Sequence, residues 1–135
     1  MAKTFIDTNI FVYALDGRDG KKQEIARACI RHLLSTSEGV VSTQVLQEFF
    51  VVATRKLEHE PLAAKQLVRN MAQNELVVID LALIESAIDT SILNPISFWD
   101  ALIVSAAASA NCGELLTEDL QHGAVIAGVR VVNPF

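Results

Sequence analysis

Short apolar runs alternate with segments of helical periodicity along most of the chain, and this alternation sets the fold class. Apolar runs that predict strands lie at residues 3–7, 40–41, 76–79, 115–116 and 129–132. Helical patterns lie between them, at residues 10–15, 21–34, 42–57, 61–74, 81–92 and 97–112, and a short helical turn is expected at 119–126. Strands joined by helices pair in parallel through right-handed crossovers. The sequence therefore predicts a three-layer α/β/α fold with a central parallel sheet.

Capping residues mark the expected ends of these helices. Thr8 or Asn9 is the expected N-cap of the first helix, and Pro61 suits the first turn of the fourth. Ser97 is expected to cap the last long helix, with Gly113 as its C-cap. No repeat, low-complexity stretch or linker interrupts the 135 residues. We therefore expect one domain that spans residues 1–135.

The composition excludes several classes of protein. Hydrophobic residues make up 51% of the chain, which is too many for a disordered protein. No stretch approaches the ~20 apolar residues of a membrane span, and the first residues lack a signal-peptide pattern. We therefore expect a cytoplasmic protein with no membrane partner. Cys29 and Cys112 stand far apart, and the histidines (His32, His59 and His122) are scattered, which argues against a disulfide framework and a zinc site.

The charge balance limits how this chain meets a phosphate substrate. The net charge is -5, from 11 Lys and Arg against 16 Asp and Glu, unlike proteins that hold nucleic acid by a general basic surface. Phosphates must therefore be met locally. One basic cluster is present, and we interpret it either as a solvated helix face or as a patch that contacts phosphates or a partner. Its members are Arg18, Lys21, Lys22, Arg27 and Arg31.

Two acidic residues directly follow predicted strands. Asp7 ends the first strand, and Asp119 closely follows the apolar pair at 115–116. Ligands of open parallel sheets bind at the carboxyl ends of the strands, so both carboxylates are candidates for a binding site. Taken singly, each is also compatible with an ordinary acidic loop residue.

Two further acids stand isolated in apolar helices. Asp100 and Glu48 are each the only charged residue in a long uncharged run. Asp100 also has a structural interpretation, because it lies three residues after the expected cap Ser97, where the helix dipole favours a carboxylate. Glu48 alternatively pairs with Arg55 or lies at an exposed edge of its helix.

Taken together, the four acids predict a cation site. Two like charges at ~4 Å cost ~4 kcal/mol at an effective dielectric of 20, so a carboxylate cluster calls for protons or cations. Oxygen ligands without a Cys or His set favour Mg²⁺ or Mn²⁺ over zinc. One or two such ions would polarise a phosphodiester and generate hydroxide from water. The predicted chemistry is metal-dependent phosphodiester hydrolysis by Asp7, Glu48, Asp100 and Asp119.

Several segments of the chain resemble the PIN-domain ribonucleases. These segments are Phe5-Ile6-Asp7-Thr8-Asn9, the lone Glu48 in a helix after a short strand, Phe98-Trp99-Asp100-Ala101-Leu102-Ile103, and Leu115-Leu116-Thr117-Glu118-Asp119-Leu120. The closing Gly123 and Asn133-Pro134-Phe135 resemble in particular the virulence-associated, VapC-like toxins of bacterial toxin-antitoxin pairs. The resemblance covers nearly the whole chain.

The resemblance implies a Mg²⁺- or Mn²⁺-dependent endoribonuclease that acts on RNA as the toxin of a toxin-antitoxin pair. It also implies a homodimer and a cognate antitoxin that covers the active site. It places four residues on the family's acidic metal-binding positions: Asp7, Glu48, Asp100 and Asp119. It places three more on polar positions that support the site: Thr8, Asn9 and Thr117. Asp119 is favoured over Glu118 because it lies two residues after Thr117, as in the motif.

Two features of the residues themselves agree with that expectation, namely the basic cluster described above and the segment at residues 45–53. Residues 45–53 are apolar nearly all round a helix, which indicates either a central core helix or a self-association surface. Tyr13, Phe98 and Trp99 are candidates for stacking on a base, although Phe98 is expected in the core.

Two rival functions compete with the nuclease. Phosphatases and phospho-acceptor domains also use an acidic Mg²⁺ pocket on an α/β sheet, but with a lysine from a late strand, and the last lysine here is Lys65. The other rival is a PIN-like interaction module without catalysis. Incubation with RNA, with and without Mn²⁺, separates it from a nuclease.

Overall fold

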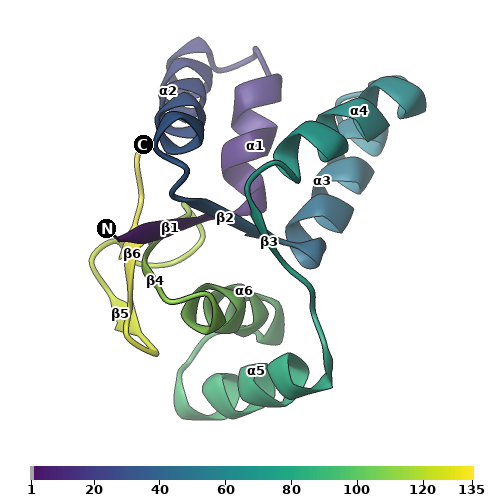
Figure 1. The fold of residues 1–135 in the computed structure, drawn as a ribbon. Helices are drawn as coiled ribbons and strands as arrows, with labels where there is room; N and C mark the ends of the chain where they lie inside the picture. Colours follow the sequence, from purple (N-terminus) through teal and green to yellow (C-terminus); the bar gives the residue numbers. More distant parts are fainter. Residues whose placement is uncertain (1) are drawn as a thin grey trace.

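A six-stranded sheet forms the middle layer of the computed structural model, which describes residues 2–135 (Figure 1). The strand order is β3-β2-β1-β4-β6-β5. Neighbouring strands are parallel, except that β5 runs antiparallel to β6. The strands are β1 (Lys3–Ile6), β2 (Gly39–Ser42), β3 (Glu75–Val77), β4 (Cys112–Leu116), β5 (Val125–Ile126) and β6 (Val129–Val132).

Helices cover both faces of this sheet. Figure 1 shows α1 to α4 on one side and α5 and α6 on the other, which confirms the predicted α/β/α layers. The helices are α1 (Thr8–Leu15), α2 (Gly20–Thr36), α3 (Thr43–Arg55), α4 (Pro61–Met71), α5 (Leu81–Leu93) and α6 (Phe98–Ser109). The predicted strands and long helices are all present, with ends that differ by a few residues.

The register of the central strands brings distant residues to one edge of the sheet. Ile6, the last residue of β1, pairs with Leu116, the last residue of β4. The next residues, Asp7 and Thr117, therefore leave the sheet at the same end. β2 lies on the other side of β1 in parallel and leads directly into α3.

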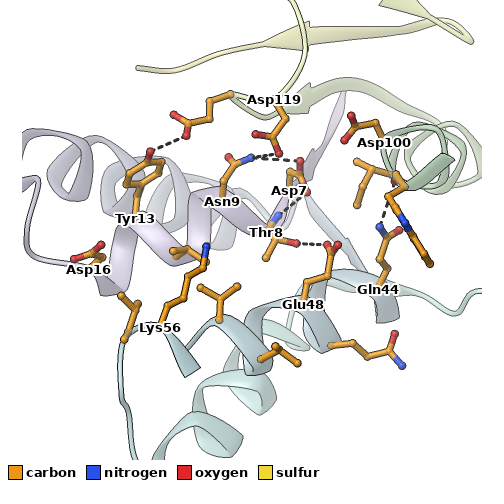
Figure 2. A pocket seen from close by; sticks show the side chains of 18 of the residues that line it. Asp7, Thr8, Asn9, Tyr13, Asp16, Gln44, Glu48, Lys56, Asp100 and Asp119 are labelled. Carbon is orange, nitrogen blue, oxygen red and sulfur yellow. Dashed lines mark hydrogen bonds between the residues drawn. The ribbon is translucent and has the colours of Figure 1, made fainter. Parts of the chain in front are cut away.

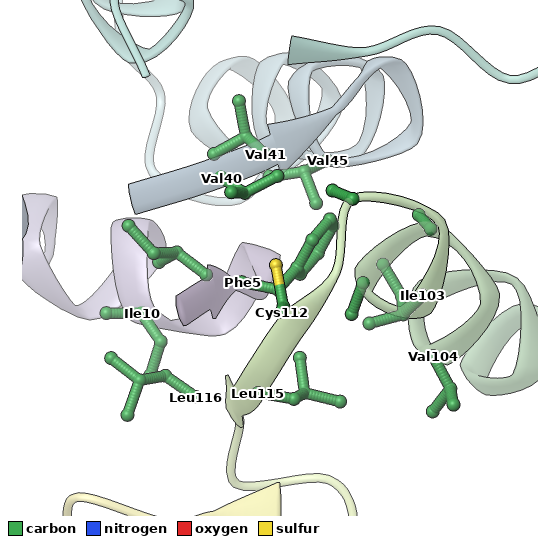
Figure 3. Close-up of a cluster of buried hydrophobic side chains, with 14 of the residues drawn as sticks. Phe5, Ile10, Val40, Val41, Val45, Ile103, Val104, Cys112, Leu115 and Leu116 are labelled. Atoms are coloured by element: carbon green, nitrogen blue, oxygen red, sulfur yellow. The ribbon is translucent and has the colours of Figure 1, made fainter. Parts of the chain in front are cut away.

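The core lies on both sides of these central strands. Figure 3 shows Phe5 of β1 and Leu115 of β4 among apolar side chains from α1, α3 and α6, and both residues are fully buried. Cys112 is buried in the same cluster and has a free thiol, as does the half-buried Cys29.

Helix α6 is buried on all sides through its middle turns. Its seven consecutive residues from Ala101 to Ala107 are all inaccessible or nearly so. Among residues 2–135, no single helix is long and apolar enough to cross a membrane. In the part of the chain that the structure describes, α5 and α6 taken together, across a bend of 119°, reach that length and hydropathy.

The helical turn predicted at 119–126 is wrong. The chain forms bends and turns there and then β5, which pairs with β6 so that Ile126 lies opposite Val129. The two residues between them, Ala127 and Gly128, have φ values of 50° and 79°. Positive φ at both central residues is the geometry of a tight hairpin turn. Alanine in that turn hides the hairpin from a sequence pattern, because Asn or Asp is the usual signal.

The C-cap assigned to Gly113 is also wrong. Helix α6 ends at Ser109, and Asn111, with φ 60°, takes the left-handed conformation. Asparagine tolerates this conformation better than most residues. The chain therefore turns earlier than predicted, and Gly113 lies within β4.

Candidate active site

Asp7 occupies the junction between β1 and α1, and the residue is only 5% exposed. It is the N-cap of α1, because its Oδ1 accepts from the backbone N–H of Thr8 at 2.7 Å. Its Oδ2 accepts from the hydroxyl of Thr117 at 2.8 Å. The prediction of Thr8 or Asn9 as the cap is therefore wrong. Asp7 has the extended backbone that a cap requires, whereas Thr8 is already helical.

Burial raises the pKa of Asp7 to about 7. The hydrogen bonds from Thr117 and Thr8 oppose this shift, while the nearby charges of Asp119 and Glu48 add to it. Near neutral pH this carboxyl group is therefore neutral in some molecules and ionised in others. A cation beside it would favour the ionised form.

A polar network joins Asp7 to the loop that follows β4 (Figure 2). The side-chain amide of Asn9 donates to Asp119 Oδ2 at 3.1 Å, to Thr117 Oγ1 at 3.2 Å and to Asp7 Oδ2 at 3.4 Å. The Thr117 hydroxyl also accepts from the backbone N–H of Asp119 at 3.0 Å. One amide and one hydroxyl therefore orient two carboxylates that lie 112 residues apart in numbering.

Glu48 faces this network from α3. Its Oε1 accepts a hydrogen bond of 2.8 Å from the hydroxyl of Thr8 (Figure 2). Among residues 2–135, no ion pair joins Glu48 to Arg55, so the pairing considered from the sequence is not observed. Thr8 is thus the residue that fixes the orientation of Glu48.

Asp100 reaches the same place from the first turn of α6. The hydroxyl of Ser97 caps the helix by accepting from the N–H of Asp100 at 3.1 Å. Burial raises the pKa of Asp100, a hydrogen bond with Ser97 lowers it, and the charge of Asp119 raises it further. The cap predicted at Ser97 is confirmed. The Asp100 carboxylate also lies close enough to Asp119 for the charge of Asp119 to affect its pKa.

All four predicted acids line one cavity of about 710 Å³. Its wall includes Asp7 at the end of β1, Glu48 from α3, Asp100 from α6 and Asp119 from the loop after β4. Asp16, Glu118, Arg18 and Lys56 are the other charged residues in this wall.

Ion pairing separates these acids into two kinds. Asp16 pairs with Arg18 at 2.8 Å, and Glu118 pairs with Lys22 at 3.1 Å. Among residues 2–135, no basic side chain pairs with the other four acids of the cavity, Asp7, Glu48, Asp100 and Asp119. The residues without a basic partner are therefore the four that the sequence predicts.

Glu118 belongs to a different cluster from its neighbour Asp119. Tyr13 donates its hydroxyl proton to Glu118 Oε1 at 2.6 Å, and Lys22 contacts Oε2 at 3.1 Å. Lys22 also lies 4.6 Å from the centre of the Tyr13 ring, and Phe135 packs edge-on against that ring. These contacts hold the loop after β4 on the side of Glu118 while Asp119 faces Asn9.

Comparison with known proteins places the chain in a family. The family model described as PIN domain matches residues 4–126. The chain belongs to the PIN domain family. No curated protein matches the sequence.

Solved structures share the PIN fold along most of their length. A toxin-antitoxin complex from Klebsiella pneumoniae has a TM-score of 0.75 and 21% identity, with 98% of each chain covered. The DNA-bound VapBC of Salmonella typhimurium has a TM-score of 0.72 and 19% identity, with 100% of each covered. The sarcin-ricin loop cleaving toxin VapC20 of Mycobacterium tuberculosis has a TM-score of 0.65 and 18% identity, covering 84% of this chain and 87% of that one. At these identities, the likeness shows a common fold.

Two residues that line the cavity of this PIN domain were not identified from the sequence. Gln44 is buried, and its side-chain amide donates to the backbone carbonyl of Trp99 at 3.3 Å, which ties α3 to α6. Its spacing of four residues from Glu48 places both on one side of α3 and was an available signal. Lys56 follows α3 directly, and nothing in its neighbourhood in the sequence points to the cavity.

The donor chemistry of the cavity fits a hard divalent cation. Its four carboxylates without basic partners are the oxygen ligands that Mg²⁺ and Mn²⁺ take. Within residues 2–135, no group of three His, Cys, Asp or Glu side chains is already gathered closely enough to hold a metal ion. The Asn9 amide lies between Asp7 and Asp119 and hydrogen-bonds to both.

Proposed function

We propose that this PIN domain is a metal-dependent endoribonuclease that hydrolyses RNA phosphodiester bonds. The observation that carries the proposal is the set of four carboxylates without basic partners in one cavity at the carboxyl ends of β1 and β4. In this proposal Asp7, Glu48, Asp100 and Asp119 hold Mg²⁺ or Mn²⁺, and Thr8, Asn9 and Thr117 orient them.

The residues of the chain supply position and charge. Thr117 and Asn9 fix the carboxylates of Asp7 and Asp119 by hydrogen bonds, and Thr8 fixes Glu48. The bound ion would act as a Lewis acid on the phosphate and would lower the pKa of a bound water. Because burial raises the pKa of Asp7 to about 7, cation binding at neutral pH would release a proton from this site.

The same proposal includes a biological setting. The Klebsiella and Salmonella structures are described as a toxin-antitoxin complex and as VapBC, and the Mycobacterium protein as a toxin that cleaves the sarcin-ricin loop. These descriptions support a role as the toxin of a toxin-antitoxin pair, with RNA as substrate and a cognate antitoxin protein as partner. A cytoplasmic location is part of the proposal and rests on the sequence composition alone. The homodimer is a further part of the proposal and rests on the family resemblance of the sequence.

A cleavage assay tests the nuclease. We expect the purified protein to cut a structured RNA in Mg²⁺ or Mn²⁺ and to stop when EDTA is added. Asp7→Asn and Asp100→Asn should each lower the rate by about 100-fold or more, because each removes a ligand. Asp16→Asn is the matched control, since this acid of the cavity wall is already paired with Arg18, and it should retain the wild-type rate.

Cleavage that survives chelation would contradict the metal mechanism. No cleavage of any RNA by a protein that is folded and loaded with Mn²⁺ would favour the inactive interaction module instead. If the protein does cleave RNA in this assay, sequencing of cellular RNA ends after brief expression would identify the RNA that it cuts.

A further inference from the structure

The only tryptophan of the chain lies exposed at the wall of the acidic cavity. Trp99 is 62% exposed, directly precedes Asp100 and lines the cavity together with it. Large aromatic side chains are mostly buried in folded proteins. An exposed indole beside a group of carboxylates therefore calls for a ligand with an aromatic face of its own.

The contacts of Trp99 hold this residue in place without covering it. The ring of Phe98 packs edge-on against the indole, with centroids 5.2 Å apart and planes at 75°. The backbone carbonyl of Trp99 accepts the hydrogen bond from Gln44, and the helix behind it is buried from Ala101 to Ala107. The indole therefore projects from a fixed support, which limits the entropy lost when a flat ligand stacks on it.

A free cation lines the same cavity on another wall. Lys56 is exposed, and among residues 2–135 no acidic group pairs with it, whereas Arg18, the other base in the wall, is bound to Asp16. Figure 2 shows Lys56 and Asp100 on opposite sides of the cavity, with Thr8 and Glu48 between them. An acidic cavity repels phosphates, so a polyanion needs such a local positive contact to approach it.

We propose that Trp99 and Lys56 form the two ends of a subsite for a short unpaired segment of the RNA. The indole of Trp99 stacks on one base, and the ammonium group of Lys56 contacts a backbone phosphate. Bases inside a duplex have no free face, whereas unstacked bases in loops and single strands bind to aromatic side chains. The subsite therefore selects single-stranded segments. It rests on the proposed nuclease function and adds to it two residues that recognise the RNA.

Fluorescence of the sole tryptophan tests the stacking directly. The probe is a short single-stranded RNA, titrated in EDTA so that no cleavage changes it. Two matched probes are the same strand with abasic sites and the same sequence as a duplex. We expect the single strand to quench the indole fluorescence and both matched probes to quench it far less. Equal quenching by the abasic strand would overturn the proposal, because a phosphate contact alone would then explain the signal.

Variants test the two residues separately through RNA affinity. Trp99→Ala should weaken binding of the single strand by about fivefold or more, and Trp99→Phe should keep most of the affinity, because a phenyl ring still stacks. Lys56→Gln should lower the slope of log affinity against log salt concentration by about one. Lys65→Gln, at an exposed lysine of α4 outside this cavity, is the control and should keep the wild-type slope.

The outcomes separate the subsite from the nuclease. An active enzyme whose affinity for single strands is unchanged in Trp99→Ala would overturn the subsite and leave the nuclease intact. A protein that shows base-dependent quenching but never cleaves RNA would overturn the nuclease and support the subsite. If Trp99→Ala instead changes the molecular mass in solution and leaves RNA affinity unchanged, the indole belongs to a protein interface and the proposal fails.

Discussion

Asp7 combines a structural and a chemical role that have opposite effects on stability. Its carboxylate caps α1 through the N–H of Thr8, which stabilises the fold. Its burial raises the pKa from 3.8 to about 7, so that the folded protein holds this proton more tightly than the unfolded chain. Between about pH 4 and pH 7, this group therefore reduces the free energy of unfolding as the pH rises, by up to about 1.4 kcal/mol for each pH unit.

We expect Asp7→Asn to remove this dependence. In EDTA, the free energy of unfolding of the variant should increase relative to that of the wild type as the pH rises from about 4 to 7. This difference between the two proteins should level off above pH 7. Urea unfolding at a series of pH values measures it. The control Asp16→Asn, at an acid paired with Arg18, should show no gain over this range. Parallel curves for wild type and Asp7→Asn would contradict the pKa shift.

Asp100→Asn separates the charge of Asp100 from its place in the helix. The substitution keeps the backbone N–H that Ser97 caps but removes a carboxylate whose pKa is raised by burial. We expect the metal-free variant to melt at the same or a higher temperature than wild type. Its gain in melting temperature on adding Mn²⁺ should shrink, because ligand binding stabilises only through affinity for the native state. An unchanged gain would remove Asp100 from the metal site.

At the level of the helix, Ser97→Ala is the complementary experiment. The serine hydroxyl is the N-cap of α6 and accepts from the N–H of Asp100. Its loss should lower the free energy of unfolding by about 1 kcal/mol. The stabilisation by Mn²⁺ should stay as in wild type, because the carboxylate remains. A calorimetric comparison of the two variants, with and without Mn²⁺, tests this pair of opposite expectations.

Gly39 fixes the position of β2 against the turn that precedes β3. A Cβ at this position would lie 2.4 Å from the side-chain oxygen of the buried Asn74 and 3.3 Å from Ile6 Cδ1. We expect Gly39→Ala to reduce the free energy of unfolding by about 1–3 kcal/mol through overpacking. Gly20→Ala, at the first residue of α2 with no atom within 4 Å of the added Cβ, should instead add about 0.4–1 kcal/mol, because alanine lowers the entropy of the unfolded chain. Equal effects in urea unfolding would contradict the packing argument.

The layered fold was predictable because its strands and helices have distinct apolar periods. The position of Asp7 and Asp119 was predictable because the carboxyl ends of parallel strands meet at one edge of the sheet. Glu48 and Asp100 were predictable because each is an isolated charge in an apolar helix. The hairpin at 126–129 was missed because its turn uses alanine with positive φ. Gln44, Lys56 and the contact between Glu118 and Tyr13 were missed because they depend on tertiary packing, which no local pattern encodes.

At the scale of the whole molecule, an apolar groove between α3 and α4 agrees with the proposed homodimer. The inner face of α3 is in the core, but Phe50 and Val51 remain 38% and 51% exposed, and Leu62 of α4 is 72% exposed. These residues line a cavity of about 570 Å³. A role of residues 45–53 in the core therefore accounts for only one side of the helix.

We expect the protein to sediment as a dimer at micromolar concentration. Phe50→Glu should shift it toward monomer, because a charge in an apolar interface is left without a partner. Leu34→Glu, at an exposed leucine of α2 outside this groove, is the control and should keep the wild-type mass. A monomeric wild type whose mass and solubility are unchanged in Phe50→Glu would exclude this helix as an interface.

Two of the four acids lie on segments of unequal stability: Asp100 lies on the largely buried helix α6, and Asp119 lies on an exposed loop. Amide hydrogens from Ala101 to Ala107 are shielded on every side and should exchange with deuterium only on global unfolding. The loop that bears Asp119 is largely exposed from Asp119 to Gly123 and should exchange through local opening. Mn²⁺ should therefore slow deuterium uptake in this loop more than in α6. The adjustable side of the cavity is then the one that Asp119 forms, and Asp100 provides the fixed side.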